Sequence, residues 1–206
     1  MPRAKSPSRT ALVDSALNTF WQKGFHVVSI GDLVRETGVS RSSLYSDFPS
    51  KDALFHACLD RYQEKVVTPA FGPVEQAGAG LAEIRTYLDH LIDRAEASTA
   101  PYKGCLVVNT LGQITPHEVE TQARLRAHGK RLYQGLRQAL SHENQAHNIL
   151  KPAEIDALAR FTLTSLQGLW AQSRGSSDSA ALRQYCETLL ALLASRLGVN
   201  EAHNDD

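Results

Sequence analysis

The residues with the clearest chemical potential form one short polar cluster: Arg41, Ser42, Ser43 and Ser46. Leu44 and Phe48, four residues apart, would bury one face of a helix and leave this cluster outward. A guanidinium group binds guanine or phosphate, hydroxyl groups bind either, and short side chains let a helix lie deep in a major groove. A solvated polar face is the alternative interpretation, and the helical pattern alone does not decide between the two.

The stretch from Ser29 to Lys51 must position this cluster, and its pattern predicts two short helices joined by a tight turn. Ser29 and Asp32 have the spacing of a capping box, and Ser40 can cap the second helix. Gly38 can adopt the left-handed conformation that the turn requires. The sequence therefore predicts a helix-turn-helix at about residues 29–48.

Signals for catalysis or metal binding are weak in this sequence. It has no GxSxG, no HExxH and no phosphate-binding glycine loop, and its eight histidines are scattered. His142, Glu143 and His147 cluster, but a five-residue spacing does not place two histidines on one helix face. We therefore expect neither an enzyme nor a metal site nor a cofactor.

The cysteines, Cys58, Cys105 and Cys186, are odd in number and include no CxxC motif, so neither a disulfide framework nor a zinc site is indicated. Cys105 follows Gly104 at the expected start of a helix, where the helix dipole can lower a thiol pKa and make the thiol reactive toward oxidants. A small buried side chain is the other interpretation, and it is favoured because cysteine is usually buried.

The chain has 206 residues, enough for a sizeable core. No apolar run approaches the length of a membrane helix, and the N-terminus lacks the apolar core of a secretion signal, so we expect a cytoplasmic protein. The net charge is zero, but residues 1–51 hold seven basic and four acidic residues, a net charge of +3, against 15 and 18 in the rest. The basic excess lies with the helix-turn-helix, and its modest size favours a dimer that doubles the phosphate contacts.

Helical periodicity continues along the chain and predicts an all-α fold. The prolines and glycines of residues 68–80 predict a loop, and the polar residues 141–148 predict another. The expected helices cover residues 8–22, 51–67, 81–97, 104–113, 117–140, 151–173 and 179–197. The last two carry apolar residues over more than one face, so each needs a second packing partner.

The residues from Thr10 to Leu59 resemble the tetracycline-repressor (TetR/AcrR) family of bacterial transcriptional regulators. The matching segments are ALNTFWQKGF and SIGDLVRETGVSRSSLYSDFPSKDALF. The resemblance rests on many positions at fixed spacing, among them Gly38-Val39-Ser40, Leu44-Tyr45 and Phe48-Pro49-Ser50-Lys51. Beyond this segment the chain is compatible with the family only in its length and helical character.

The resemblance implies an N-terminal DNA-binding domain at residues 1–50 and a C-terminal effector-binding and dimerisation domain at residues 51–206. It implies that Arg41, Ser42, Ser43 and Tyr45 meet bases and phosphates of double-stranded DNA, and that Ser29 and Lys51 hold the DNA backbone. It also implies a homodimer through the last two helices, which would present two recognition helices to a palindromic operator.

The family further implies a repressor whose DNA binding responds to a small-molecule effector in the helical body. Candidate lining residues are Tyr62, Leu88, Ile92, Cys105, Asn109, Phe161 and Trp170, each of which is equally compatible with a core role. A mostly apolar lining would suit a hydrophobic or aromatic compound. The alternative function is a helical small-molecule or cysteine-based redox sensor with weak or no DNA binding.

Three positions depart from the usual family motif. Val28 stands where a threonine is common, Gly31 where an arginine often contacts DNA, and Asp47 where a neutral or basic residue is usual. Phosphates repel an acid, although a carboxylate can accept a hydrogen bond from the cytosine amine. These departures leave the expected fold intact, make the operator unpredictable and favour weak binding.

Overall fold

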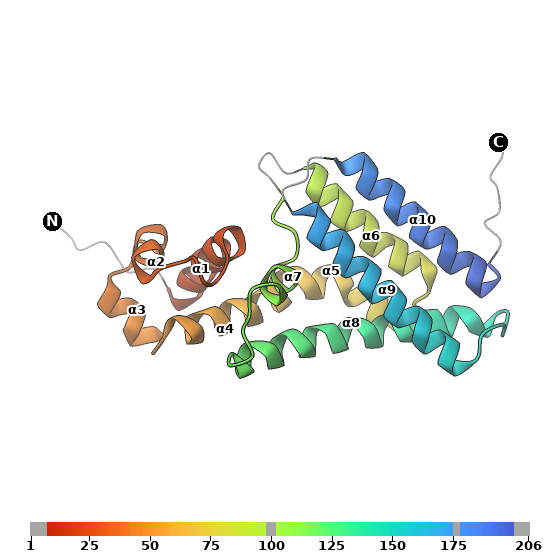
Figure 1. Ribbon diagram of the computed structural model, residues 1–206, viewed down its shortest axis with the longest axis horizontal. Coiled ribbons are helices and arrows are strands. Elements are labelled where there is room, and N and C mark those ends of the chain that lie inside the picture. Colours follow the sequence, from red (N-terminus) through yellow and green to blue (C-terminus); the bar gives the residue numbers. More distant parts are fainter. Residues whose placement is uncertain (1–7, 98–101, 175–177, 200–206) are drawn as a thin grey trace. The chain divides into compact units, whose positions relative to one another are not determined.

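A computed structural model describes residues 8–97, 102–174 and 178–199 (Figure 1). These residues form helices joined by turns and contain no strand, so the predicted all-α fold is confirmed. They fall in two compact units, drawn from Met1–Val67 with Cys105–Arg126 and from Thr68–Gly104 with Ala127–Asp206. The basic N-terminal residues 1–7 lie outside the described part. None of the described helices is both long enough and apolar enough to cross a membrane.

The first unit is built around α1 (Arg9–Lys23), which packs against α4 (Lys51–Tyr62) and α2 (Ile30–Thr37). Its core is aromatic. The centre of the Phe55 ring lies 5.0 Å from the centre of the Phe20 ring and 4.6 Å from the centre of the Phe25 ring. Gly24 ends α1 with a φ of +88°, and the Gln113 side chain occupies the space that a Cβ would need. Through α1, this core packs against α2, the first helix of the helix-turn-helix.

The segment after α4 is helical where the sequence predicted a break. A π-helical turn (Gln63–Val67), α5 (Thr68–Phe71) and a 3-10 turn (Gly72–Glu75) follow in succession. Pro69 and Pro73 are each the second residue of a short turn, where a backbone N–H has no partner within that turn. The predicted loop over residues 68–80 is therefore wrong as far as Glu75.

The second predicted loop, residues 141–148, is also partly helical. It follows α8 (Val119–Gln145), which extends five residues beyond the predicted end at residue 140. The short helix α7 (Leu106–Leu111) precedes α8. The side chain of Asn144 is buried near the end of α8, where its amide donates to the Leu150 carbonyl at 3.0 Å and accepts from the Leu150 N–H at 2.9 Å. Its polar side chain contributed to the prediction of a loop here, but in the structure it stabilises the turn that follows the helix.

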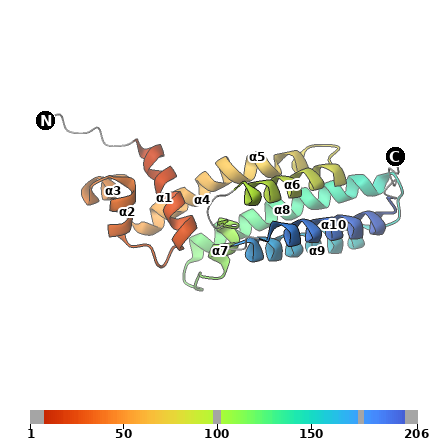
Figure 2. The same cartoon turned by 90° about the horizontal axis from the view of Figure 1, so that it is seen from above.

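The second unit contains α6 (Leu81–Glu96), α9 (Pro152–Ser173), α10 (Ser179–Leu197) and the part of α8 that follows Arg126. α10 packs against both α6 and α9, and the view in Figure 2 shows α9 and α10 side by side. Each of these helices buries one mostly apolar stripe. The opposite face of α9 and α10 is exposed and carries Phe161, Tyr185 and Leu192, which are 50%, 40% and 51% exposed.

Candidate DNA-binding surface

A reciprocal capping box fixes the start of α2. The Ser29 hydroxyl accepts from the Asp32 N–H at 3.1 Å, and the Asp32 carboxylate accepts from the Ser29 N–H at 3.0 Å and from the Ser29 hydroxyl at 2.6 Å. These hydrogen bonds, with that from Arg35, hold the pKa of Asp32 well below its usual range. The predicted cap is confirmed. The Ser29 hydroxyl already donates within the chain, and its contact with DNA stays a prediction.

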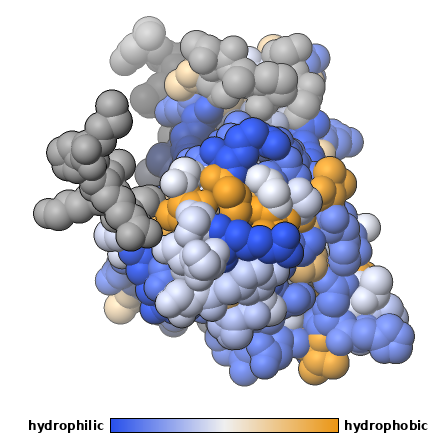
Figure 3. Space-filling model, turned by 90° about the vertical axis from the view of Figure 1, so that its left-hand side faces the viewer, coloured by the Kyte–Doolittle hydropathy of each residue, from blue (hydrophilic) through white to orange (hydrophobic). Residues whose placement is uncertain are grey.

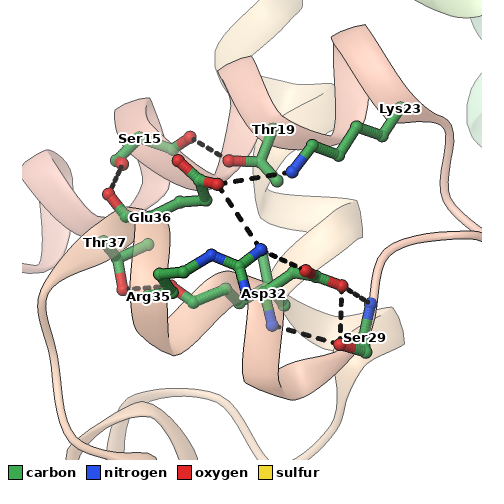
Figure 4. Close-up of polar contacts among 9 residues, drawn as sticks. Ser15, Thr19, Lys23, Ser29, Asp32, Arg35, Glu36 and Thr37 are labelled. Carbon is green, nitrogen blue, oxygen red and sulfur yellow. Dashed lines mark hydrogen bonds and ion pairs between the residues drawn. The ribbon is translucent and has the colours of Figure 1, made fainter.

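Charged residues along α2 and the end of α1 neutralise one another (Figure 4). Arg35 pairs with Asp32 and lies 3.7 Å from Glu36, and Glu36 in turn pairs with Lys23 of α1 at 3.3 Å. The Ser15 hydroxyl of α1 also donates to the Glu36 carbonyl at 3.0 Å. The network ties α2 to α1, and it pairs Lys23 and Arg35 with acids of the same N-terminal region.

The turn and the recognition helix follow the prediction. Gly38 has a φ of +71°, Val39 is buried, and the Ser40 hydroxyl caps α3 (Arg41–Asp47) by accepting from the Ser43 N–H at 3.2 Å. Along α3, residues four apart share a face. Leu44 and Phe48 form the buried face, and the remaining pairs are Arg41 with Tyr45, Ser42 with Ser46, and Ser43 with Asp47.

The polar positions of α3 lie at the surface of the first unit. Arg41, Ser42, Tyr45, Ser46 and Asp47 are exposed and Ser43 is half-buried. The Arg41 guanidinium lies 5.8 Å from the centre of the Tyr45 ring, and the Ser42 and Ser40 hydroxyls are 3.0 Å apart. Figure 3 views the end of this unit that α2 and α3 form. Outside the grey atoms, blue and pale polar surface predominates, crossed by a strip of apolar surface. This outward hydrogen-bonding face can contact bases and phosphates.

Lys51 has a structural role that the sequence did not reveal. Its ammonium group donates to the carbonyls of Phe25 and Val28, each at 3.0 Å, and lies 4.4 Å from the centre of the Phe25 ring. These contacts hold the connection between α1 and α2. Their partners lie more than 20 residues away in sequence, so no local pattern could indicate them. The predicted contact with the DNA backbone is not tested by this arrangement.

Sequence reasoning also missed Arg9, the first residue of α1. Its guanidinium lies 4.7 Å from the centre of the Phe48 ring, at the end of α3. The contact joins the N-terminus of α1 to the C-terminal end of the recognition helix. Arg9 belongs to a groove of about 350 Å³ that Val13, Ala57 and Arg61 also line.

Comparison with known protein families identifies the family of this chain. Residues 12–58 match the model described as "Bacterial regulatory proteins, tetR family", and residues 80–189 match the model described as "Tetracyclin repressor-like, C-terminal domain". The chain belongs to the TetR family. It is a DNA-binding transcriptional regulator. The resemblance seen in residues 10–59 is confirmed, and the second match extends the family assignment to the C-terminal part of the chain.

Individual relatives agree with this assignment. The HTH-type transcriptional repressor ComR of Escherichia coli K12 is 27% identical over 194 residues, which cover 92% of this TetR-family chain and 90% of ComR. The regulator RutR of the same organism is 35% identical over 86 residues, covering 42% and 40% of the two chains.

Solved structures extend the likeness to the whole fold. A cysteine mutant of the TetR-family regulator CifR, solved with 26-base-pair operator DNA, has a TM-score of 0.73 at 25% identity and covers 96% of this chain and 98% of its own. A TetR-family regulator from Cytophaga hutchinsonii has a TM-score of 0.77 at 20% identity, covering 95% and 98%.

The predicted effector-lining residues of this TetR-family chain divide between the two units. In the first, Tyr62 and Cys105 are buried, and the Tyr62 hydroxyl lies 3.4 Å from the Cys105 sulfur, to which it donates. Asn109 of α7 is half-buried in the same unit. In the second unit, Leu88, Ile92 and Trp170 are buried. A role for these residues in effector binding stays a prediction.

One expectation about these residues needs correction, and the favoured interpretation of another is supported. Phe161 does not line the interior of its unit, because it lies on the exposed side of α9, two residues from buried Ala159. Cys105 stands at the N-cap of α7, but its full burial raises the pKa of the thiol despite hydrogen bonds that lower it. Burial therefore outweighs these hydrogen bonds, which supports the packing interpretation of Cys105 that the sequence favoured.

The histidines that drew attention in the sequence form no metal site in the described part of the chain, where no three potential ligands lie close enough to hold an ion. His142 and Glu143 belong to the last turn of α8 and not to a loop. The Glu143 carboxylate accepts from the Leu81 N–H at 2.9 Å, so it contributes to the start of α6.

Proposed function

We propose that this regulator is a repressor, which binds a palindromic operator as a homodimer and releases it when a small-molecule effector binds the helical body. The observation that carries the proposal is the outward face of α3, whose polar residues are exposed while Leu44 and Phe48 are buried. The names of ComR, a transcriptional repressor, and of CifR, solved with operator DNA, support it.

In this proposal Arg41, Ser42, Ser43 and Tyr45 meet bases and phosphates, and Ser29 and Lys51 hold the backbone. An ammonium group has three N–H donors. Lys51 uses two of them for the Phe25 and Val28 carbonyls, so one donor is left for a phosphate oxygen. Lys51 would then contact DNA from a position that its own intramolecular bonds fix.

The homodimer would form through α9 and α10. Large apolar side chains on an exposed helix face favour a protein partner, and Phe161, Tyr185 and Leu192 meet this description. Small exposed residues beside them would allow two helices to approach closely: Gly168, Ala171, Ala181 and Ala191. A two-fold dimer also matches the symmetry of a palindromic operator.

The effector would act by a population shift. A ligand changes an equilibrium between two conformations only if it binds one of them more tightly. Leu88, Ile92 and Trp170 supply a mostly apolar environment, which suits a hydrophobic or aromatic compound. The protein would act in the cytoplasm, where its DNA lies.

A mobility-shift titration of the full-length protein with the DNA upstream of its own coding sequence tests this function. We expect a discrete complex that competitor DNA of unrelated sequence does not remove, and a protein of twice the chain mass by light scattering. A folded protein that binds this DNA and unrelated DNA equally, or that stays monomeric at the concentrations used, would contradict the proposal.

A further inference from the structure

The acids that precede α3 in the sequence each have a basic partner. Asp14 accepts from Arg61 at 2.7 Å, Asp32 pairs with Arg35, and Glu36 pairs with Lys23 at 3.3 Å. These carboxylates therefore stabilise the helical arrangement of the first unit. Their charges are balanced within the chain and are not available to another molecule.

Asp47 differs from these acids. It is the exposed last residue of α3, and no residue in the described part of the chain forms a hydrogen bond or ion pair with its carboxylate. A negative charge at the C-terminal end of a helix is unfavourable, because the helix dipole is negative there. The folded chain therefore gains nothing from an acid at this position, and the carboxylate is free to meet a ligand.

The position of Asp47 places it on the face that would contact DNA. It shares a stripe with Ser43, beside the outermost stripe of Ser42 and Ser46. Arg41 is the other charged residue of α3, so the exposed part of this helix has no net charge. Attraction to phosphates then comes from neighbouring segments, and α3 itself offers mainly hydrogen-bonding groups.

We propose that Asp47 is a specificity-determining residue that accepts a hydrogen bond from the exocyclic amine of a cytosine in each half-site. An ionised carboxylate only accepts hydrogen bonds. In the major groove, guanine presents two acceptors, thymine an acceptor and a methyl group, and adenine a donor beside an acceptor, whereas cytosine presents a donor. The carboxylate can thus accept a hydrogen bond from the cytosine amine, whereas phosphate repels it. The inference rests on the function proposed above, in which residues of α3 meet bases, and it places that contact in the major groove.

The test is in vitro selection from a pool of randomised duplex DNA with the full-length wild type and with Asp47→Asn. We expect the wild type to enrich a symmetric motif with cytosine at one position of each half-site. Replacing that cytosine should weaken wild-type binding by roughly 10-fold or more. The amide of an asparagine side chain can both donate and accept, which suits adenine. The Asp47→Asn variant should therefore select adenine at that position and keep the rest of the motif.

A matched control is Asp52→Asn, which removes the same charge from an exposed acid in the first turn of the next helix, α4. It should select the wild-type motif. If Asp47→Asn also selects the wild-type motif and only binds all sequences more tightly, Asp47 merely repels phosphate and the inference is overturned. If the folded wild type enriches no motif, the proposed binding to a specific operator fails instead, so the two failures can be told apart.

Discussion

At the scale of single residues, the ammonium group of Lys51 holds the connection that leads into the helix-turn-helix. Lys51→Ala removes both hydrogen bonds to the Phe25 and Val28 carbonyls. Because these acceptors would then lack their charged donor, we expect a loss of about 1–3 kcal/mol in the free energy of unfolding, measured by urea denaturation. DNA affinity should fall with it.

Lys23→Ala provides a control, because Lys23 forms an exposed ion pair with Glu36. Such pairs contribute less than about 1 kcal/mol. If Lys51→Ala lowered DNA affinity but left the free energy of unfolding unchanged, Lys51 would act through phosphate contact alone, and the positioning role would be wrong.

His128 of α8 gives the chain a defined response to acid. Burial, together with the charge of Arg131, lowers its pKa to about 4, whereas in the unfolded chain it titrates near 6.5. The unfolded chain therefore binds a proton first as the pH falls, and the folded state loses stability from about pH 6.5 down to about pH 4. We expect a loss of about 2 kcal/mol between pH 7 and pH 5 from this residue.

Urea denaturation of the wild type and of His128→Gln at the two pH values measures this effect. Glutamine does not titrate, so the variant should lose less stability on acidification than the wild type, whatever its stability at pH 7. Equal losses in the two proteins would show that His128 does not couple folding to pH.

At the scale of elements, the Ser40 cap is the local contact that starts α3. Ser40→Ala removes the acceptor of the Ser43 N–H and should cost about 0.5–2 kcal/mol in the free energy of unfolding. Ser46→Ala is the control, because Ser46 is exposed on the same helix and is not its cap. Chemical denaturation that found the two variants equally stable would contradict the capping role.

The start and turn signals of the helix-turn-helix were predictable from the sequence because they act over three or four residues. Ser29, Gly38 and Ser40 act as predicted. The error over residues 68–75 arose because a proline is compatible with the first turn of a helix, so Pro69 did not break the chain into a loop. Asparagine is typical of loops, so the sequence around Asn144 predicted one. The hydrogen bond from the Asn144 side chain to the Leu150 carbonyl stabilises the turn at the end of α8, and it depends on a residue outside the helix.

The candidate site was predictable only in part, for the same reason. The exposure of the α3 face follows from the four-residue spacing of Leu44 and Phe48. The contacts of Lys51, the placement of Arg9 over Phe48 and the pairing of Arg35 with Asp32 and Glu36 depend on how the helices pack. The pairing of Lys23 and Arg35 with Glu36 and Asp32 leaves the net charge of +3 in residues 1–51 unchanged, because these acids are already counted in it.

At the scale of the whole molecule, the exposed face of α9 and α10 determines whether the protein acts as a pair. Leu192→Glu places a charge on this face, where it would be buried between two chains. We expect a monomer by light scattering and at least a roughly 10-fold loss of DNA affinity, because two linked reading helices bind far more tightly than one.

Val119→Glu is the matched control. Val119 is an apolar residue that is 63% exposed and belongs to the first unit, not to α9 or α10. This variant should remain a dimer. A dimeric Leu192→Glu protein would mean that the two chains meet through another surface.

The most direct test of the central claim is hydroxyl-radical footprinting of the DNA upstream of the coding sequence, with the wild type and with Ser42→Glu. A glutamate at Ser42 adds a negative charge to the outermost stripe of α3 without touching its buried face. We predict that the wild type protects two half-sites about 34–36 Å apart and that the folded variant protects neither. Protection by the variant that matches the wild type would contradict a DNA-reading role for α3.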